Sequence, residues 1–166
     1  LSKILLTNGK VPFVLAGRTC SDLIIGIDVK QNTAAFSLIA DGGRIVHSKT
    51  WNSRKRERLT EEQVALYLSE LVLIEKESFD FPPSNIVVHR DGRVFESEIA
   101  GLERACEELA EAGVLASNWS LTVLEIKKTG PVTVRFFDTV YSKEGARTEN
   151  PMIGSWLQLS DEEGFV

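Results

Sequence analysis

Residues 85–93 of the chain read NIVVHRDGR, a run of isoleucine and valine that leads to an acid. Such an apolar run is typical of a buried strand. Burying a lone carboxylate costs several kcal/mol, which is a large share of the net stability of a whole domain. The stretch therefore predicts that Asp91, at the end of this strand, faces a positive partner.

The composition is that of an ordinary globular protein. Of 166 residues, 43% are hydrophobic and 26% are charged, which is enough for one sizeable core. Cys20 and Cys106 are far apart and offer neither a disulfide framework nor paired metal-ligand spacing. No apolar run approaches the length of a membrane span, and the first residues lack the order of a signal peptide. We expect a cytoplasmic protein with no membrane partner.

Charge is distributed unevenly along the chain. The net charge of -5 argues at first against a polyanionic partner. Basic residues nevertheless gather at residues 53–60 (SRKRERLT), at Lys127 and Lys128, and around Asp91. Each basic run alone is also typical of a solvated surface loop. Net charge therefore does not exclude nucleic acid as a partner.

The first third of the chain predicts three strands. Residues 22–29 (DLIIGIDV) form a continuous apolar run, which indicates a central strand covered on both faces. Residues 33–40 follow after a short polar break, and 44–51 follow the turn signal DGG at 41–43. We expect these three strands to form an antiparallel meander.

A helix is predicted next, because apolar residues recur at helical spacing. They are Val64, Leu68, Leu71 and Val72. Thr60 and Gln63, three residues apart, predict a capping box at its start. The following strand is expected over residues 85–89.

The remaining residues predict a second helix and further strands. The helix is expected over 97–112, with Gly113 as its stop. Strands are expected over 121–128, 132–140 and 154–159. The resulting order of strands and helices indicates an α/β fold.

This order has a consequence for two acids. A helix between the third and fourth strands acts as a crossover, so the fourth strand can lie parallel to the first, most simply as its neighbour. Asp28 and Asp91 would then lie side by side, with Gly26 leaving room beneath the carboxylates. Two close carboxylates repel unless a cation lies between them, and Mg²⁺ or Mn²⁺ suits oxygen ligands. The sequence therefore predicts a metal site at Asp28 and Asp91.

Several segments together resemble a known family. They are GKVPFVLAG leading into DLIIGIDV, then IVVHRDGR, LEIKKTGPVTVRFF and ENPMIGSW. The order and the acids resemble the ribonuclease H-like fold, a mixed sheet of an antiparallel three-strand meander plus parallel strands with flanking helices. In detail they resemble the Piwi domain of Argonaute proteins, of the prokaryotic type. The resemblance implies a lead-in segment at 1–20 and a Piwi-like domain at 21–166 that is incomplete at its C-terminal end.

The resemblance implies roles for individual residues. Asp28 matches the first catalytic aspartate of the family and Asp91 the second. The family also uses a glutamate near the start of the first helix, and Glu62, or alternatively Glu61, is the candidate. Acids in a first turn also complement the helix dipole, so a capping role stays open. The fourth ligand of the family would lie beyond the residues given, and Asp161 is not assigned to it.

The implied function is guide-directed cleavage. A guide strand of RNA or DNA would pair with a complementary target, and a metal-dependent endonuclease site with two Mg²⁺ or Mn²⁺ ions would cut that target. Lys30, Arg90 and Arg93 are candidates for phosphate contacts, or alternatively for offsetting the carboxylates. The family implies further domains in the same longer protein and a role in host defence.

Three alternatives compete with a guided nuclease. One is an Argonaute that binds guide and target without cutting. A second is another ribonuclease H-like nuclease, such as a transposase or a resolvase. The third is a sugar kinase or actin-like ATPase, which the residues after Asp28 disfavour, because such proteins place small residues there for phosphate to approach.

Overall fold

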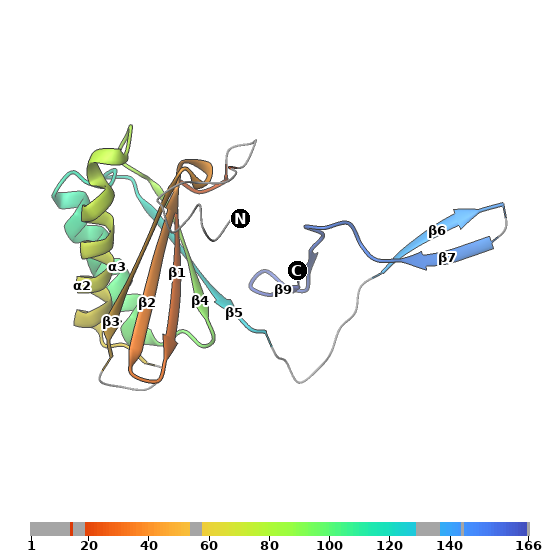
Figure 1. Cartoon of the computed structure of the whole chain (residues 1–166), viewed down its shortest axis with the longest axis horizontal. Helices are drawn as coiled ribbons and strands as arrows, with labels where there is room; N and C mark the ends of the chain where they lie inside the picture. Colours follow the sequence, from red (N-terminus) through yellow and green to blue (C-terminus); the bar gives the residue numbers. More distant parts are fainter. Residues whose placement is uncertain (1–13, 15–18, 54–57, 129–136, 144, 166) are drawn as a thin grey trace, which may run out of the picture. The chain divides into compact units, whose positions relative to one another are not determined.

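The computed structural model of the chain describes residues 14, 19–53, 58–128, 137–143 and 145–165 (Figure 1). Contacts divide the chain into two compact units, Leu1–Lys128 and Thr129–Val166. The expected lead-in over 1–20 falls largely outside the described residues, so that boundary stays a prediction. Among the described residues, no helix combines the length and apolar character needed to cross a membrane.

The first unit contains a five-stranded mixed sheet in the order β3-β2-β1-β4-β5. The strands are β1 (Leu23–Lys30), β2 (Thr33–Ala40), β3 (Ile45–Asn52), β4 (Asn85–Asp91) and β5 (Ser120–Ile126). β1, β2 and β3 form the predicted antiparallel meander, whereas β4 is parallel to β1 and β5 is parallel to β4. The predicted ribonuclease H-like fold class, with β4 as the direct neighbour of β1, is confirmed.

Two helices pack on one face of this sheet, as Figure 1 shows. They are α2 (Glu61–Glu75) and α3 (Glu96–Glu111), with short 3-10 turns at η1 (Asp41–Gly43) and η2 (Lys76–Ser78). The predicted capping box of α2 is present, since Thr60 N donates to Gln63 Oε1 at 3.1 Å and Gln63 N donates to Thr60 Oγ1 at 3.3 Å. Both helix starts lie where the sequence pattern predicts them, within one residue.

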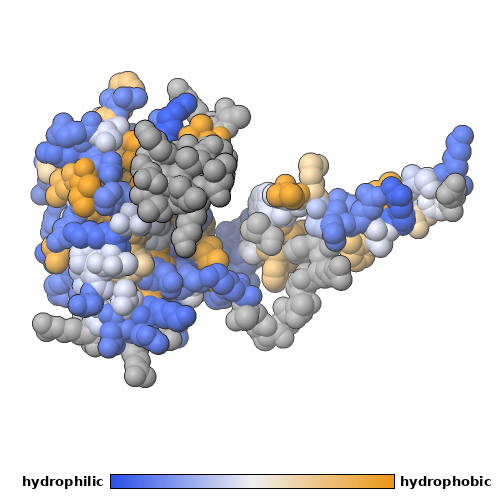
Figure 2. Space-filling view, viewed as in Figure 1, coloured by the Kyte–Doolittle hydropathy of each residue, from blue (hydrophilic) through white to orange (hydrophobic). Residues whose placement is uncertain are grey.

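The core lies between the sheet and these helices. Alternate residues of β1, beginning with Leu23, are buried against it, as are alternate residues of β2 and β4. Cys106 on α3 is a small buried hydrophobe, and burial raises the pKa of its thiol to about 12. In Figure 2, hydrophilic residues cover much of the visible surface of this unit, and hydrophobic residues appear as separate patches. The helices α2 and α3 and the core beneath them thus cover one face of the sheet.

Helices α2 and α3 approach each other closely at Gly101. A Cβ built there would lie 2.5 Å from Glu61 O and 2.8 Å from Val64 Cβ. Only glycine leaves room for this contact, which brings the first turn of α2 against α3.

Among its described residues, the second unit contains two short hairpins. β6 (Asp138–Ser142) pairs with β7 (Gly145–Glu149), and β8 (Leu157–Gln158) pairs with β9 (Gly164–Phe165). The strand expected over 132–140 is displaced toward the C-terminus, and its first five residues lie outside the described ones. The strand expected over 154–159 is reduced to β8. Strands this short and exposed show no clear periodicity of apolar residues, which explains why the bounds of these two strands were predicted incorrectly.

Candidate functional site

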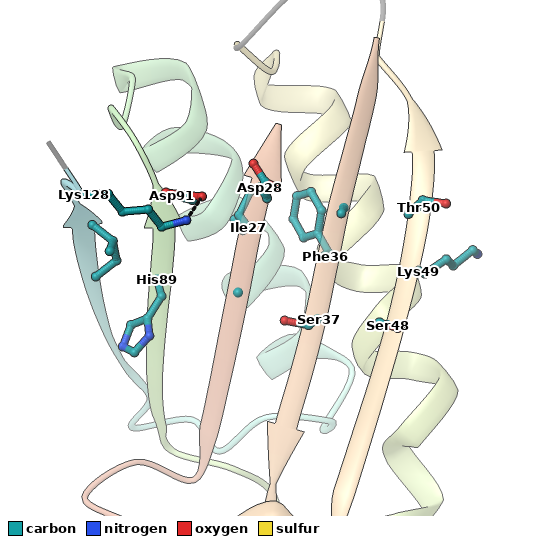
Figure 3. A pocket seen from close by; sticks show the side chains of 13 residues that line it. Ile27, Asp28, Phe36, Ser37, Ser48, Lys49, Thr50, His89, Asp91 and Lys128 are labelled. Atoms are coloured by element: carbon teal, nitrogen blue, oxygen red, sulfur yellow. Dashed lines mark hydrogen bonds and ion pairs between the residues drawn. The ribbon is translucent and has the colours of Figure 1, made fainter. Parts of the chain in front are cut away.

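Asp28 and Asp91 lie at the ends of two neighbouring parallel strands. The register of β1 and β4 ends with Ile27 opposite Arg90. Asp28 and Asp91 are the next residues of the two strands. Ile27 and Arg90 point into the core, where they are 4% and 3% exposed. Alternation places the two aspartates on the opposite, open face of the sheet, as Figure 3 shows. The structure thus brings together the two acids that the sequence pairs.

The two aspartates line a cavity of about 420 Å³ on this open face (Figure 3). The other lining residues come from every strand of the sheet and from the residues after β5: Gly26, Ile27, Ala35, Phe36, Ser37, Ser48, Lys49, Thr50, His89, Ile126 and Lys128. Small side chains form its floor, and a Cβ at Gly26 would lie 2.5 Å from Ser37 Oγ. Gly26 therefore leaves the surface of the sheet beneath the two carboxylates free of a side chain, as the sequence predicts.

Lys128 is a site residue that the sequence reasoning missed. Its Nζ lies 2.6 Å from Asp91 Oδ2, and it lines the same cavity (Figure 3). The hydrogen bond to Asp91, then the charge of Asp91 and that of Asp28, raise the pKa of Lys128. In the sequence, Lys127 and Lys128 form a basic pair with no other distinguishing feature. The signal for a role in the site is the position of Lys128 just beyond a strand that is parallel to β4.

Arg90 does not lie in the cavity. Its side chain is buried on the helix side of the sheet, where Nε lies 3.3 Å from Glu98 Oε2, and its Nη1 donates to Asp91 O. Glu98 Oε1 also accepts from Leu59 N at 3.1 Å. The expectation that Arg90 contacts a phosphate disagrees with this burial, because adjacent residues of a strand point to opposite faces. Arg90 instead joins β4 to α3.

Glu61 and Glu62 occupy the first turn of α2 and do not line the cavity. Glu61 Oε1 lies 3.7 Å from Arg104 Nη1. Hydrogen bonds from its own backbone N–H and from Thr60, and then the charge of Arg104, hold the pKa of Glu62 below its usual value. This is the setting of a helix-capping acid. The structure does not bring either glutamate to Asp28 and Asp91.

The two remaining basic candidates are exposed. Lys30 ends β1 two residues beyond Asp28, so alternation directs it to the open face, although it does not line the cavity. The Arg93 guanidinium lies 5.4 Å from the ring centre of Phe95. Both are accessible to a polyanion, and their role stays a prediction.

Comparison with known families decides the identity of this arrangement. Residues 2–163 match the family model described as the Piwi domain. The chain belongs to the Piwi domain family. The predicted resemblance to the Piwi domain of Argonaute proteins is confirmed. Membership of this family excludes the transposase, resolvase and ATPase alternatives.

Relatives of this Piwi domain are Argonaute proteins. The chain is 31% identical over 149 residues to protein argonaute of Aquifex aeolicus, covering 81% of this chain and 19% of that protein. A structure of Clostridium butyricum Argonaute bound to a guide DNA and a 19-mer target DNA has a TM-score of 0.67 at 22% identity, covering 92% of this chain and 20% of that one. A crystal structure of A. aeolicus Argonaute has a TM-score of 0.51 at 24% identity, covering 87% and 21%. These likenesses show a shared fold, and the chain spans about a fifth of each relative.

The acid pair of the Piwi domain fits part of a divalent metal site. Two carboxylates on neighbouring strands supply the oxygen donors that Mg²⁺ and Mn²⁺ prefer. Within the described ranges, no group of three histidine, cysteine, aspartate or glutamate side chains converges to complete a site. Asp28 and Asp91 would therefore supply two ligands, and further ligands would come from elsewhere.

Proposed function

We propose that this Piwi domain takes part in guide-directed binding of a complementary nucleic-acid strand and cuts that strand in a metal-dependent reaction. The observation that carries the proposal is the convergence of Asp28 and Asp91 in one open cavity on the exposed sheet face. Support comes from family membership and from the relative bound to a guide and a target DNA. In such an arrangement base pairing supplies the sequence choice, while the protein contacts the backbone of the duplex.

Each group of this site has a distinct task in the proposed reaction. Asp28 and Asp91 would hold Mg²⁺ or Mn²⁺, and the ion would supply activation of water and charge stabilisation at the leaving oxygen. Gly26 and Ser37 are small and leave space in the cavity, so that a sugar-phosphate backbone can approach the carboxylates. Lys30 and Arg93 would contact phosphates at the rim.

The third acid of the site stays a proposal based on the family resemblance. Glu62, or alternatively Glu61, is assigned, although both lie at the start of α2 away from the cavity lining. Glutamine variants at both positions distinguish these two candidates in one cleavage assay.

A domain that binds without cutting is the second candidate function. One observation favours it: among the described residues, no third acid converges on Asp28 and Asp91. Such a protein would retain guide and target and leave the target whole.

The test uses full-length protein loaded with a guide and a labelled complementary strand, with Mn²⁺ titrated. We expect wild type to cut the target, and D28N and D91N to lower the rate by roughly a thousandfold while retaining guide binding. D41N is the matched control, because Asp41 pairs with Arg44 at η1. Undiminished cutting by D91N would reject the assigned site. Guide and target binding by a wild type that never cuts would establish the second candidate.

A further inference from the structure

We propose that Lys128 is a built-in counter-cation of the Asp28 and Asp91 pair, and that its ammonium group must leave Asp91 before a divalent cation binds there. The inference rests on the proposed metal site and adds a residue that competes for it. The inference concerns the affinity of this chain for a divalent cation, which can be measured separately from cleavage.

The sheet directs Lys128 to the acids. β5 is parallel to β4 with Ile126 opposite Asp91, and Gly92 N donates to Ile126 O at 3.1 Å, which holds the two strand ends together. Ile126 and Lys128 both line the cavity. Lys127, between them, lies 3.2 Å from Glu125 Oε2 and does not line it. Of the two lysines, only Lys128 is placed to compete for Asp91.

The contact between Lys128 and Asp91 is short but open to exchange with solvent. The 2.6 Å separation of Lys128 Nζ and Asp91 Oδ2 is that of a short charge-assisted hydrogen bond. The lysine side chain is 71% exposed, however, and an exposed ammonium on a flexible stem is easily replaced by water. Lys128 therefore neutralises the acids without blocking them permanently.

Competition follows from charge and space. An ammonium group and a divalent cation repel each other, and both bind the same carboxylate oxygens. Removing the ammonium leaves two neighbouring acids with no cation between them, which raises their affinity for a divalent ion. It also removes the partner that stabilises Asp91 when no metal is bound.

The experiment measures Mn²⁺ binding to the full-length protein by isothermal titration calorimetry, without nucleic acid. We expect K128M to bind Mn²⁺ about fivefold more tightly than wild type, which is the scale of one exposed ion pair. K128R, which keeps the charge, and K127M, which changes only the neighbouring lysine, should both stay close to wild type. The melting temperature without metal should fall slightly in K128M and recover on adding Mn²⁺.

Mn²⁺ binding to D91N separates the possible failures. If D91N loses Mn²⁺ and K128M binds it no more tightly than wild type, the role of Lys128 is overturned and the metal site stands. If D91N binds Mn²⁺ as wild type does, the proposed metal site is wrong, and the role of Lys128 fails with it. Absence of Mn²⁺ binding in both wild type and K128M overturns both, whereas binding gained only in K128M supports the competition.

Discussion

Two ion pairs lie back to back at the end of β4. On the helix side, the side chains of Arg90 and Glu98 are 4% and 3% exposed, and on the open side, those of Lys128 and Asp91 are 71% and 35% exposed. The buried pair cannot separate without leaving a charge in the core, whereas water can replace either partner of the open pair. Burial, rather than the charges themselves, thus separates a fixed structural link from a site that a ligand can take over.

The largest effect is expected on removing one partner of the buried pair. E98A should lower the free energy of unfolding by roughly 3–5 kcal/mol, because Arg90 is left charged and buried. It also removes the acceptor of Leu59 N. Urea denaturation of wild type and variant measures the loss, and E103A, at an exposed position of α3, is the control.

A double variant sharpens this prediction. R90M/E98M removes both charges of the pair from the core, so we expect it to recover part of the stability that E98A loses. Recovery should stay incomplete, since Leu59 N and Phe95 N lose the Glu98 carboxylate as acceptor. R90M and E98M are the matching single variants, and a double variant as unstable as the sum of these two would show that the pair is not coupled.

The contrast between the two faces of the sheet also explains which features could be predicted from the sequence. The strands of the first unit follow from apolar runs, and the neighbouring positions of Asp28 and Asp91 follow from one crossover between parallel strands. Arg90 was predicted in the site because it adjoins Asp91 along the chain, yet alternation places adjacent residues on opposite faces. The two-residue alternation of the strand is therefore a better guide to the position of Arg90 than its adjacency to Asp91 in the sequence.

Lys128 and the two glutamates show a different limit. Lys128 reaches Asp91 only because β5 pairs with β4 in one register and ends at Ile126, and strand ends are poorly defined by sequence patterns. Glu61 and Glu62 carry no pattern that separates a catalytic acid from a capping acid, since both roles place acids in a first helical turn. Three-dimensional position decides such cases.

An intermediate effect is expected on the helix side at Gly101. In an exposed helix, replacing glycine by alanine stabilises by roughly 1 kcal/mol. G101A should instead destabilise by about 1–3 kcal/mol, because the new Cβ would meet the Glu61 carbonyl at 2.5 Å, a backbone atom that cannot rotate away. Urea denaturation gives the sign directly. A stabilised variant would show that α2 and α3 can separate without cost.

The smallest effect is expected on the open side at Gly26. The Cβ of G26A would meet Ser37 Oγ at 2.5 Å, the same separation as at Gly101, but this atom ends a side chain that can turn. The gain from replacing a strand glycine, about 0.5–1 kcal/mol, should therefore be largely cancelled in wild type and appear in full in an S37A background. Unfolding free energies of the four proteins in this double-mutant cycle measure the coupling. Equal effects of G26A in both backgrounds would show that Ser37 does not limit the floor.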